Sequence, residues 1–475
     1  MSRRLGAIAC LVVAALLAVG AAANLNLDVT GDERRVIDLG VFGFAKGGVF
    51  QLTVNHFFID DPDAVMLDSS GRLHHNESLG FALMVVESAQ DARYLRTMAS
   101  TESKARRECL DSDALAPRDS NNNVLPRFFF RLSNLTMAEV TKQYPSVAIE
   151  TPGLYALFFF NCKGYNEKGT LKPLPVSFSA EATEYNVGTG GVPNYLSLGH
   201  QPLPMLYGFF TLVFAGLAFV WAREMRRNPT HTHRIHYVML FLVGVKALSL
   251  FFETLKYSHY ASTGHASVWD FFYYVFLTAK GITLFAVVVL LGSGWSLLKA
   301  MLSERDKQLL MFILPAQVVI NISLAVVEES NEGTRGWGSW SDILRIADVV
   351  CCCVVLLPIV WSIKNLREAA EHDEKALQTL SRMRLFRTFY IAVVAYVYTT
   401  RIILAMIEGS LPFRVLWISN LLAELVAVAF YAYSGYQFRP AAENPYLRVQ
   451  QEDLDEIEMR AEIGGGGGNK AGSPV

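Results

Sequence analysis

The stretch LPMLYGFFTLVFAGLAFVWA, residues Leu203–Ala222, decides the class of this fold. It contains no charged side chain. It is also as long as the run of about 20 apolar residues that an α-helix needs to cross the hydrocarbon core of a bilayer. Six further apolar segments of similar length follow: Ile235–Tyr257, Val268–Leu291, Gln308–Val327, Ile343–Ile363, Leu385–Ile407 and Val415–Phe438. Residues 203–438 therefore predict a bundle of seven transmembrane helices.

The composition of the whole chain agrees with a membrane protein. Hydrophobic residues make up 52% of the 475 residues and charged residues only 18%, below the roughly 25% of typical soluble domains. The net charge of −2 gives no overall basic field, so we expect no nucleic-acid partner. Six cysteines are too few for a small scaffold that depends on disulfides.

The basic residues between the spans predict the orientation of the chain. The loops after the first, third and fifth spans are rich in Lys and Arg, whereas the loops after the even-numbered spans hold essentially Arg335 and Arg414. The positive-inside rule therefore places the odd-numbered loops in the cytosol. Seven crossings then put the N-terminal region in a lumen or outside the cell and the C-terminus in the cytosol.

The N-terminus is typical of a secretory signal peptide over residues 1–23. Arg3 and Arg4 precede an apolar run, Leu5–Val19, and the small residues 20–23 suit cleavage just before Asn24. The apolar run is short for a spanning helix. The alternative is that this segment is a first transmembrane anchor.

Residues 24–200 predict a luminal β-sandwich domain. They contain no apolar run long enough to span a membrane, and short stretches of β-branched and aromatic residues alternate with Gly, Pro and Asn. The expected strands are Val36–Phe44, Val49–Val54, Phe81–Val86, Arg127–Leu132, Gly153–Phe160 and Val176–Ala180. The polar interval 88–123 is expected to be a long loop with some helix.

The predicted luminal domain also contains sites for two covalent modifications. Asn76 and Asn134 each begin an Asn-X-Ser/Thr triplet, which is the acceptor for N-glycosylation after a signal peptide. Cys109 and Cys162 are the only cysteines of this domain, and we expect them to form a disulfide in an oxidising lumen. The alternative is two free buried thiols.

Ionisable residues inside the predicted spans are the main candidates for function. Each costs about 2.5–3.5 kcal/mol at the centre of a spanning helix on insertion scales, so we expect them to face the interior of the bundle. The residues are Lys246, Glu253, Lys280, Asp348, Arg401 and Glu424.

Two interpretations of these charges remain open. In the first, Lys246, Lys280 and Arg401 line a polar cavity that holds the anionic headgroup of a phospholipid or a carboxylate. In the second, Lys246 or Lys280 pairs with an acidic side chain of the bundle. Glu253 and Glu424 are then the acidic partners, and the ion pairs only fix the packing.

Residues 439–475 predict a cytosolic, acidic, Gly-rich and disordered tail. Tyr446 and Val449 form a tyrosine–x–x–apolar pattern a few residues beyond the last span. Such a pattern is typical of a sorting signal that clathrin adaptors bind. The alternative is a solvated tail without a recognition role.

Nothing in the sequence indicates catalysis. We find no P-loop, dinucleotide fingerprint or convincing nucleophile–base arrangement, so we predict no catalytic residues, no cofactor and no enzyme activity. His231, His233 and His236 do not predict a metal site, because the first two lie on different helix faces and the seventh span contains no histidine.

Two sequence segments carry a resemblance to a known family. The end of the seventh span and the residues after it read YSGYQFRP, residues 433–440, followed by NPYL, residues 444–447. The segment Gly153–Cys162 resembles a late luminal strand of the same family. The chain thus resembles the lung seven-transmembrane receptors, which join a GOLD-like luminal domain to seven helices and include the plant candidate G-protein-coupled receptors.

This resemblance implies a Golgi or endosomal membrane as the residence, with the plasma membrane as the alternative. We therefore expect a receptor-like protein in membrane trafficking or cargo sorting, with coat proteins or clathrin adaptors as partners. The first alternative is a receptor coupled to a heterotrimeric Gα, although no Asp-Arg-Tyr triplet ends the third span at residues 290–295. The second alternative, a channel or transporter, depends only on the buried charges.

Overall fold

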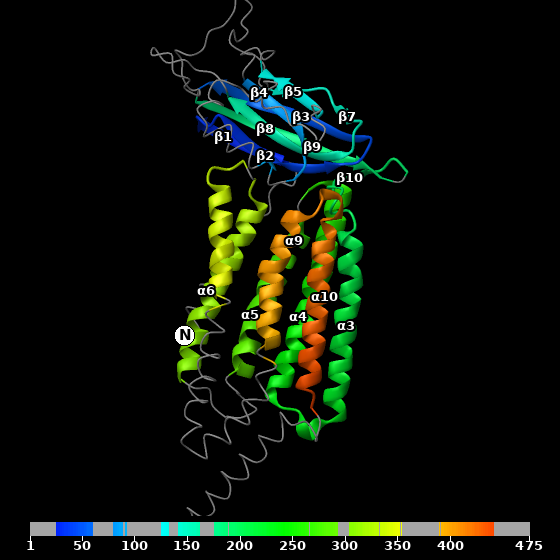
Figure 1. Cartoon of the computed structure of the whole chain (residues 1–475), viewed down its shortest axis with the longest axis vertical. Coiled ribbons are helices and arrows are strands. Elements are labelled where there is room, and N and C mark those ends of the chain that lie inside the picture. Colours follow the sequence, from blue (N-terminus) through cyan, green and yellow to red (C-terminus); the bar gives the residue numbers. More distant parts are fainter. Residues whose placement is uncertain are drawn as a thin grey trace, which may run out of the picture.

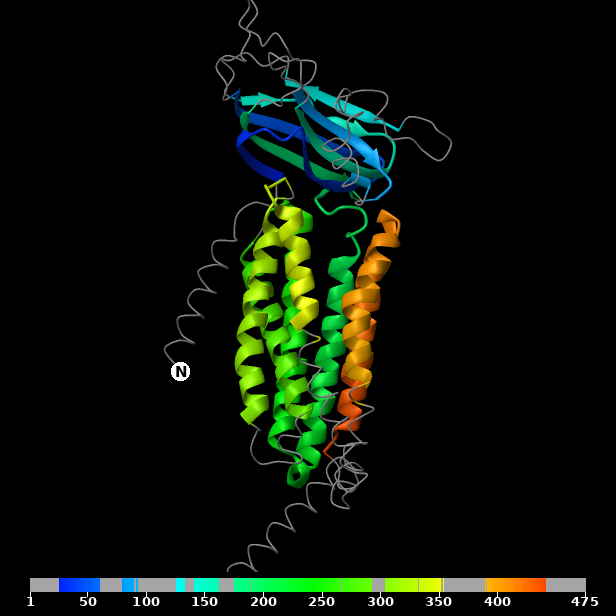
Figure 2. The ribbon, with the colours of Figure 1, turned by 60° about the vertical axis from the view of Figure 1, so that its left-hand side comes forward.

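Two antiparallel β-sheets form the N-terminal part of the protein, and they lie across one end of a helical bundle (Figures 1 and 2). The computed structural model describes residues 25–59, 79–88, 91–92, 125–132, 141–161, 175–188, 190–265, 267–292, 304–331, 333–351, 353, 389 and 391–440. The predicted fold class, a β domain followed by a helical membrane bundle, is confirmed.

The first sheet has six strands. Its main order is β1 (Leu25–Asp32), β9 (Val176–Val187), β3 (Gly48–Ile59) and β6 (Thr141–Gln143), while β7 (Val147–Ile149) also pairs with β3 and β10 (Pro193–Asn194) with β9. The second sheet has four strands in the order β2 (Val36–Phe44), β8 (Gly153–Asn161), β4 (Leu79–Val86) and β5 (Arg127–Arg131). Six of these strands, β2, β3, β4, β5, β8 and β9, overlap the stretches expected from the sequence.

Aromatic side chains join the two sheets into a sandwich. Phe159 of β8 and Phe178 of β9 come from different sheets, and their ring centroids lie 4.6 Å apart. Phe81 of β4 meets Phe178 edge to face at 5.5 Å. Both Phe81 and Phe159 are fully buried. Aromatic pairs of this kind add about 0.5–1.5 kcal/mol beyond the burial of their area, so this cluster holds the sandwich together.

Helices occupy each of the seven predicted spans within the described residues. They are α3 (Leu203–Arg227), α4 (Arg234–Thr263), α5 (Val268–Gly292), α6 (Glu304–Glu329), a helix over residues 337–351, a helix from residue 391 that runs through the π-helical turn η5 (Thr399–Ile403) into α9 (Leu404–Ser410), and α10 (Trp417–Gln437). By length and composition, α3, α4, the part of α5 over Val268–Val288 and the segment Phe413–Gln437 can cross a membrane. Pro315–Val327 and Ile391–Ile403 are shorter apolar helices.

Local sequence signals set the ends of α4. The backbone N–H of His233 donates to Nδ1 of His236 at 2.8 Å, which satisfies one of the donors that a helix N-terminus leaves free. Gly264 ends the helix with a φ of 70°, a left-handed conformation that glycine adopts without steric cost. The connection between α3 and α4 contains the short helix η4 (Pro229–His231).

Candidate functional site

A buried ion pair joins α4 to α10 near the middle of the bundle. Lys246 Nζ lies 2.7 Å from both carboxylate oxygens of Glu424 and donates a hydrogen bond to Oε1. Only 4% of Lys246 and 8% of Glu424 is exposed. The ammonium group also lies 5.4 Å from the centroid of the Phe214 ring on α3, a favourable cation–π contact. Removing either partner would leave an uncompensated charge inside the protein.

A second ion pair joins the helix over residues 337–351 to the π-helical turn η5. Arg401 Nη1 lies 2.7 Å from Oδ2 of the buried Asp348. The other oxygen of Asp348 accepts a hydrogen bond of 2.7 Å from Nε2 of Gln317 on α6. Single π-helical turns within α-helices frequently mark functional positions, and this one carries the cation of the pair.

Lys280 and Glu253 differ from the four paired residues. Within the part of the chain that the structure describes, Lys280 makes neither a hydrogen bond nor an ion pair, although it interacts electrostatically with Glu253 and Glu424. The hydroxyl group of Tyr207 on α3 donates to Asn420 Oδ1 on α10 at 3.2 Å. Both Lys280 and Glu253 keep a partly exposed surface.

The structure thus distributes the six predicted residues among three arrangements. Lys246 and Glu424 form one direct pair, and Asp348 and Arg401 form the other. Lys280 and Glu253 remain without a direct ionic partner in the described chain. The sequence reasoning missed Gln317 and Tyr207, and the signal for Gln317 was a polar amide within an apolar span.

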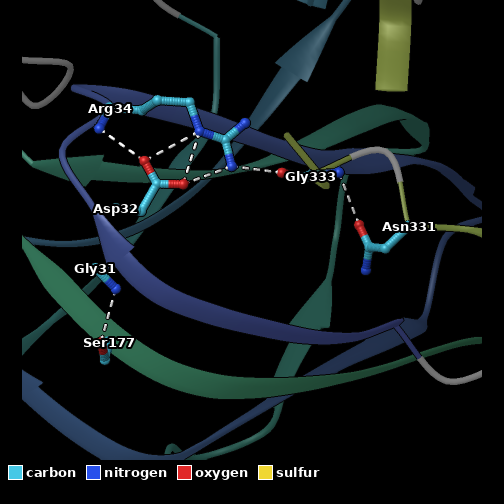
Figure 3. Close-up of polar contacts among 6 residues, drawn as sticks. All are labelled: Gly31, Asp32, Arg34, Ser177, Asn331 and Gly333. Carbon is cyan, nitrogen blue, oxygen red and sulfur yellow. Dashed lines mark hydrogen bonds and ion pairs between the residues drawn. The ribbon is translucent and has the colours of Figure 1, made fainter. Parts of the chain in front are cut away.

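One of three contacts between the β-sandwich and the bundle lies at the loop between α6 and the helix over residues 337–351 (Figure 3). Arg34 Nη2 donates a hydrogen bond of 2.7 Å to the carbonyl oxygen of Gly333. Asp32 orients Arg34 through a contact of 2.8 Å between Oδ2 and Nε. The loop is itself held by a hydrogen bond from the Gly333 N–H to Asn331 Oδ1 at 2.9 Å.

The charge of Arg34 also affects the protonation of Asp32. Burial alone would raise the pKa of Asp32, but the hydrogen bonds and positive charge of Arg34, with a contribution from Arg335, outweigh it and hold the pKa below its usual value of 3.8. Asp32 is therefore ionised at neutral pH and keeps Arg34 aimed at the bundle.

A second contact involves the segment between β10 and α3. The N–H of Leu198 donates to the Gly43 carbonyl at 2.9 Å, and the N–H of Gly43 donates to Ser197 Oγ at 3.0 Å. Phe413, in the short helix η6 (Phe413–Val415), packs against the outer apolar cluster of the four-stranded sheet. A Cβ atom at Gly199 would collide with the Phe413 carbonyl oxygen, so only glycine permits this approach.

A third contact lies at the end of α4. The N–H of Tyr195 donates to the carbonyl oxygen of Ala261 at 3.1 Å. The ring of Tyr195 lies against Gly264, where a Cβ atom would come within 2.7 Å of it. The loops after the second, fourth and sixth predicted spans therefore all contact the β-sandwich or the segment that leads from it. These three contacts together are called the sandwich–bundle joint below.

Several predicted features lie outside the described residues. They are the signal peptide at 1–23, the glycosylation sites Asn76 and Asn134, the cysteines Cys109 and Cys162, and the sorting motif with Tyr446 and Val449. These remain predictions from the sequence.

Comparisons with known proteins agree with this architecture. The family model "GOST, seven transmembrane domain" matches residues 202–445. The protein "Candidate G-protein coupled receptor 6" of Arabidopsis thaliana is 31% identical over 438 residues, which cover 92% of this chain and 94% of that protein. The resemblance drawn from the sequence is confirmed. This chain, a receptor-like protein with seven transmembrane helices and an N-terminal β-sandwich, thus belongs to the GOST seven-transmembrane family.

Proposed function

We propose that this receptor-like membrane protein acts in membrane trafficking or cargo sorting in the Golgi and endosomes. Its β-sandwich would be the recognition domain in the lumen, and its tail would contact clathrin adaptors or coat proteins through Tyr446 and Val449. The plasma membrane is the alternative residence. The sandwich–bundle joint is the observation that carries the proposal, because it couples the recognition domain to the helices.

Coupling through the joint has a specific route. Arg34 holds the loop at Gly333, and the helix that follows this loop carries Asp348. Asp348 in turn pairs with Arg401 in the π-helical turn. A ligand that moves β1 and β2 would therefore shift a loop that leads into the helix carrying the buried Asp348. This arrangement favours a receptor over a domain tethered by a flexible linker.

The distribution of charge supports a luminal position of the sandwich. The loops that contact the sandwich contain few basic residues, while the connection between α3 and α4 at the other end is flanked by Arg226, Arg227 and Arg234. Basic residues favour the cytosolic side. Lys280, which lacks a direct ionic partner in the described chain, is the residue that we propose for contact with an anionic phospholipid headgroup.

The test combines topology, location and cargo. Full-length protein with a C-terminal tag should localise to the Golgi or endosomes, and protease added outside intact vesicles should remove the tag while sparing the sandwich. Arg34→Gln should reduce copurification of cargo and cause its missorting without changing the location. Lys46→Gln, which removes an exposed charge from the β2–β3 turn, is the matched control.

Three outcomes would contradict this proposal. They are digestion of the sandwich in sealed vesicles, absence of the protein from the Golgi and endosomes, and normal sorting in cells that lack the protein. Because the topology arm needs no cargo, a wrong orientation is distinguishable from a wrong role.

A second candidate function is signalling through a heterotrimeric G protein. The observation that favours it is the name of the Arabidopsis relative, which describes that protein as a candidate G-protein-coupled receptor. Purified full-length protein should then accelerate nucleotide exchange on a purified Gα. Exchange at the spontaneous rate with every Gα class would exclude this function.

A further inference from the structure

Four exposed arginines lie at the end of the bundle opposite the β-sandwich. Arg223, Arg226 and Arg227 belong to the last turns of α3, and Arg234 begins α4. Figure 1 shows this connection at the bottom of the bundle, far from the strands. None of the four makes an ion pair or hydrogen bond with another described residue. We call these residues the arginine cluster.

The three arginines of α3 continue a stripe of exposed apolar side chains. They occupy positions i, i+3 and i+4, which share one face of a helix. Met205, Leu212 and Phe219 lie on the same face at intervals of seven residues, and they are 85%, 73% and 68% exposed. Such large exposed apolar side chains on a spanning helix face the acyl chains of lipids.

The spacing along α3 places the arginines at the level of the lipid headgroups. The uncharged run Leu203–Ala222 is about 30 Å long at a rise of 1.5 Å per residue, which matches the hydrocarbon core, and Arg223 follows it directly. Met225, in contrast, is buried and lies on the opposite side of the last turn. The arginines of α3 therefore point outward to the surrounding membrane and not toward the bundle axis.

Helix α4 repeats this arrangement. Arg234 shares a face with Tyr237 and Phe241, at positions i, i+3 and i+7, and both aromatic side chains are exposed. The helix dipole explains basic residues at the C-terminus of α3, but it disfavours a cation at the N-terminus of α4. Arg234 is consistent with the preference of basic residues for the cytosolic side, and an anion bound from outside the described chain would offset the unfavourable dipole.

The connection between the two helices holds the arginine cluster in place. Asn228 Nδ2 donates to Glu224 Oε1 at 3.0 Å, so this neighbouring carboxylate already has a partner. Thr232 Oγ1 donates to the Asn228 carbonyl at 2.8 Å. A site that is already ordered loses little conformational entropy when a ligand binds.

We propose that the arginine cluster binds a phospholipid whose headgroup carries a phosphomonoester, as in a phosphorylated inositol lipid. The planar guanidinium group binds phosphate through two parallel hydrogen bonds, and several arginines favour a multiply charged headgroup over a single phosphodiester. The acyl chains would lie along the apolar stripe of α3. This site is on the outside of the bundle and is independent of the function proposed above.

The acidic tail of the same chain is the competing occupant. Residues 452–458 contain five acidic side chains. Helix α10 ends near this site, since the Phe438 carbonyl lies 2.9 Å from His236 Nε2. The lipid is favoured because the arginines continue faces that are exposed along the helices, whereas His236 and Phe438 are buried inside the bundle.

Purified full-length protein in detergent tests the proposal by native mass spectrometry. The probe is dioctanoyl phosphatidylinositol 4-phosphate, and we expect saturable binding of one molecule. The variant Arg226→Gln/Arg227→Gln/Arg234→Gln should lose affinity by tenfold or more. The single variant Arg234→Gln should lose affinity by about threefold and serves if the triple variant does not fold.

The controls separate this site from general attraction to anions. The variant Lys46→Gln/Arg345→Gln/Arg414→Gln removes three exposed cations elsewhere and should bind the probe normally. Dioctanoyl phosphatidylinositol, without the phosphomonoester, and inositol 1,4-bisphosphate, without acyl chains, should each bind at least tenfold more weakly.

Three results would overturn the proposal. The first is unchanged affinity in the folded triple variant, and the second is equal binding of the phosphorylated and unphosphorylated lipids. The third is a tenfold gain of probe affinity when residues 450–475 are deleted, because the tail would then be the native occupant of the arginine cluster.

Discussion

The interior of the β-sandwich is held by apolar packing, whereas the interior of the bundle also contains charged pairs. Phe81, Phe159 and Phe178 fill the sandwich with apolar surface, whereas charged pairs such as Lys246–Glu424 cross the bundle. The hydrophobic effect drives apolar side chains into the interior of the sandwich, which is surrounded by water. Lipid provides no hydrophobic driving force for helix association, and polar contacts between helices help to hold a membrane bundle together. The two regions should therefore fail by different mechanisms when their interiors are altered.

The largest effect is expected in the sandwich. Phe159→Ala should lower the free energy of unfolding by about 4 kcal/mol, because it removes a buried ring and leaves a cavity. Limited proteolysis of full-length protein against denaturant measures this change. Phe58→Ala, at a position that is 49% exposed, is the control and should have a small effect. Equal losses in both variants would mean that the aromatic core does not determine stability.

The second largest loss of stability is expected in the bundle, when one partner of its buried ion pair is removed. Glu424→Leu should destabilise it by about 3 kcal/mol, because Lys246 would remain buried without its partner. Lys246→Met in the same protein should restore most of the loss, which thermal unfolding in detergent would show. Asp342→Asn, a change at an exposed carboxylate, should have little effect. A double variant as unstable as the single one would contradict the ion-pair explanation.

The sandwich–bundle joint should show a smaller and pH-dependent effect. Arg34→Gln should cost about 1 kcal/mol, since the pair is partly exposed. Because Arg34 lowers the pKa of Asp32 below 3.8, its contribution is complete above about pH 4 and is lost as the pH falls through the lower pKa of the folded protein.

Hydrogen exchange of residues 330–336 measures this effect of Arg34→Gln at the joint. The variant and the wild type should differ at pH 6, and the difference should shrink steadily as the pH falls below 4. Lys46→Gln should match the wild type at every pH. A difference that does not shrink below pH 4 would show that Arg34 acts without Asp32.

The last effect, no larger than that at the joint, concerns Glu184 in the sandwich, which has no ionic partner among the described residues, unlike Glu424 in the bundle. Glu184 lies opposite the buried Phe50, and burial raises its pKa from 4.5 to about 8. The folded state therefore favours the protonated form, and stability should fall as the pH rises from 4.5 to 8. Glu184 remains partly exposed, so we expect about 1 kcal/mol.

Glu184→Gln should remove this pH dependence, while Glu150→Gln, at an exposed position, should retain it. Thermal unfolding of the full-length protein between pH 4.5 and 8 provides the measurement. An identical pH dependence in the wild type and Glu184→Gln would assign the effect to another group.

The order of the domains and helices could be predicted from the sequence, but the contacts between them could not. Length and hydropathy located the spans, because each helix must cross the same thickness of lipid. Strand β1 was missed, although Leu25, Leu27 and Val29 alternate with polar residues. It directly follows the apolar N-terminal segment, so its alternation is hard to separate from that segment in the sequence. The short strands β6, β7 and β10 have too few residues to show any pattern.

Partner choice within the site could not be predicted. The spacing in α4 put Lys246 and Glu253 on one face, but only the packing of α4 against α10 decides that Lys246 pairs with Glu424. The contact of Arg34 with Gly333 joins residues 299 positions apart and uses a backbone carbonyl. No residue type marks such an acceptor in a sequence.

The π-helical turn at Thr399–Ile403 should allow the sixth helix to lose one residue without breaking. A π turn accommodates one more residue than an α turn, so deleting a single residue there would restore ordinary winding instead of breaking the helix. Because the wide turn absorbs the extra residue, the segments on either side would keep close to their present alignment. The loss of one residue elsewhere in the span would instead rotate the face that follows by about 100°.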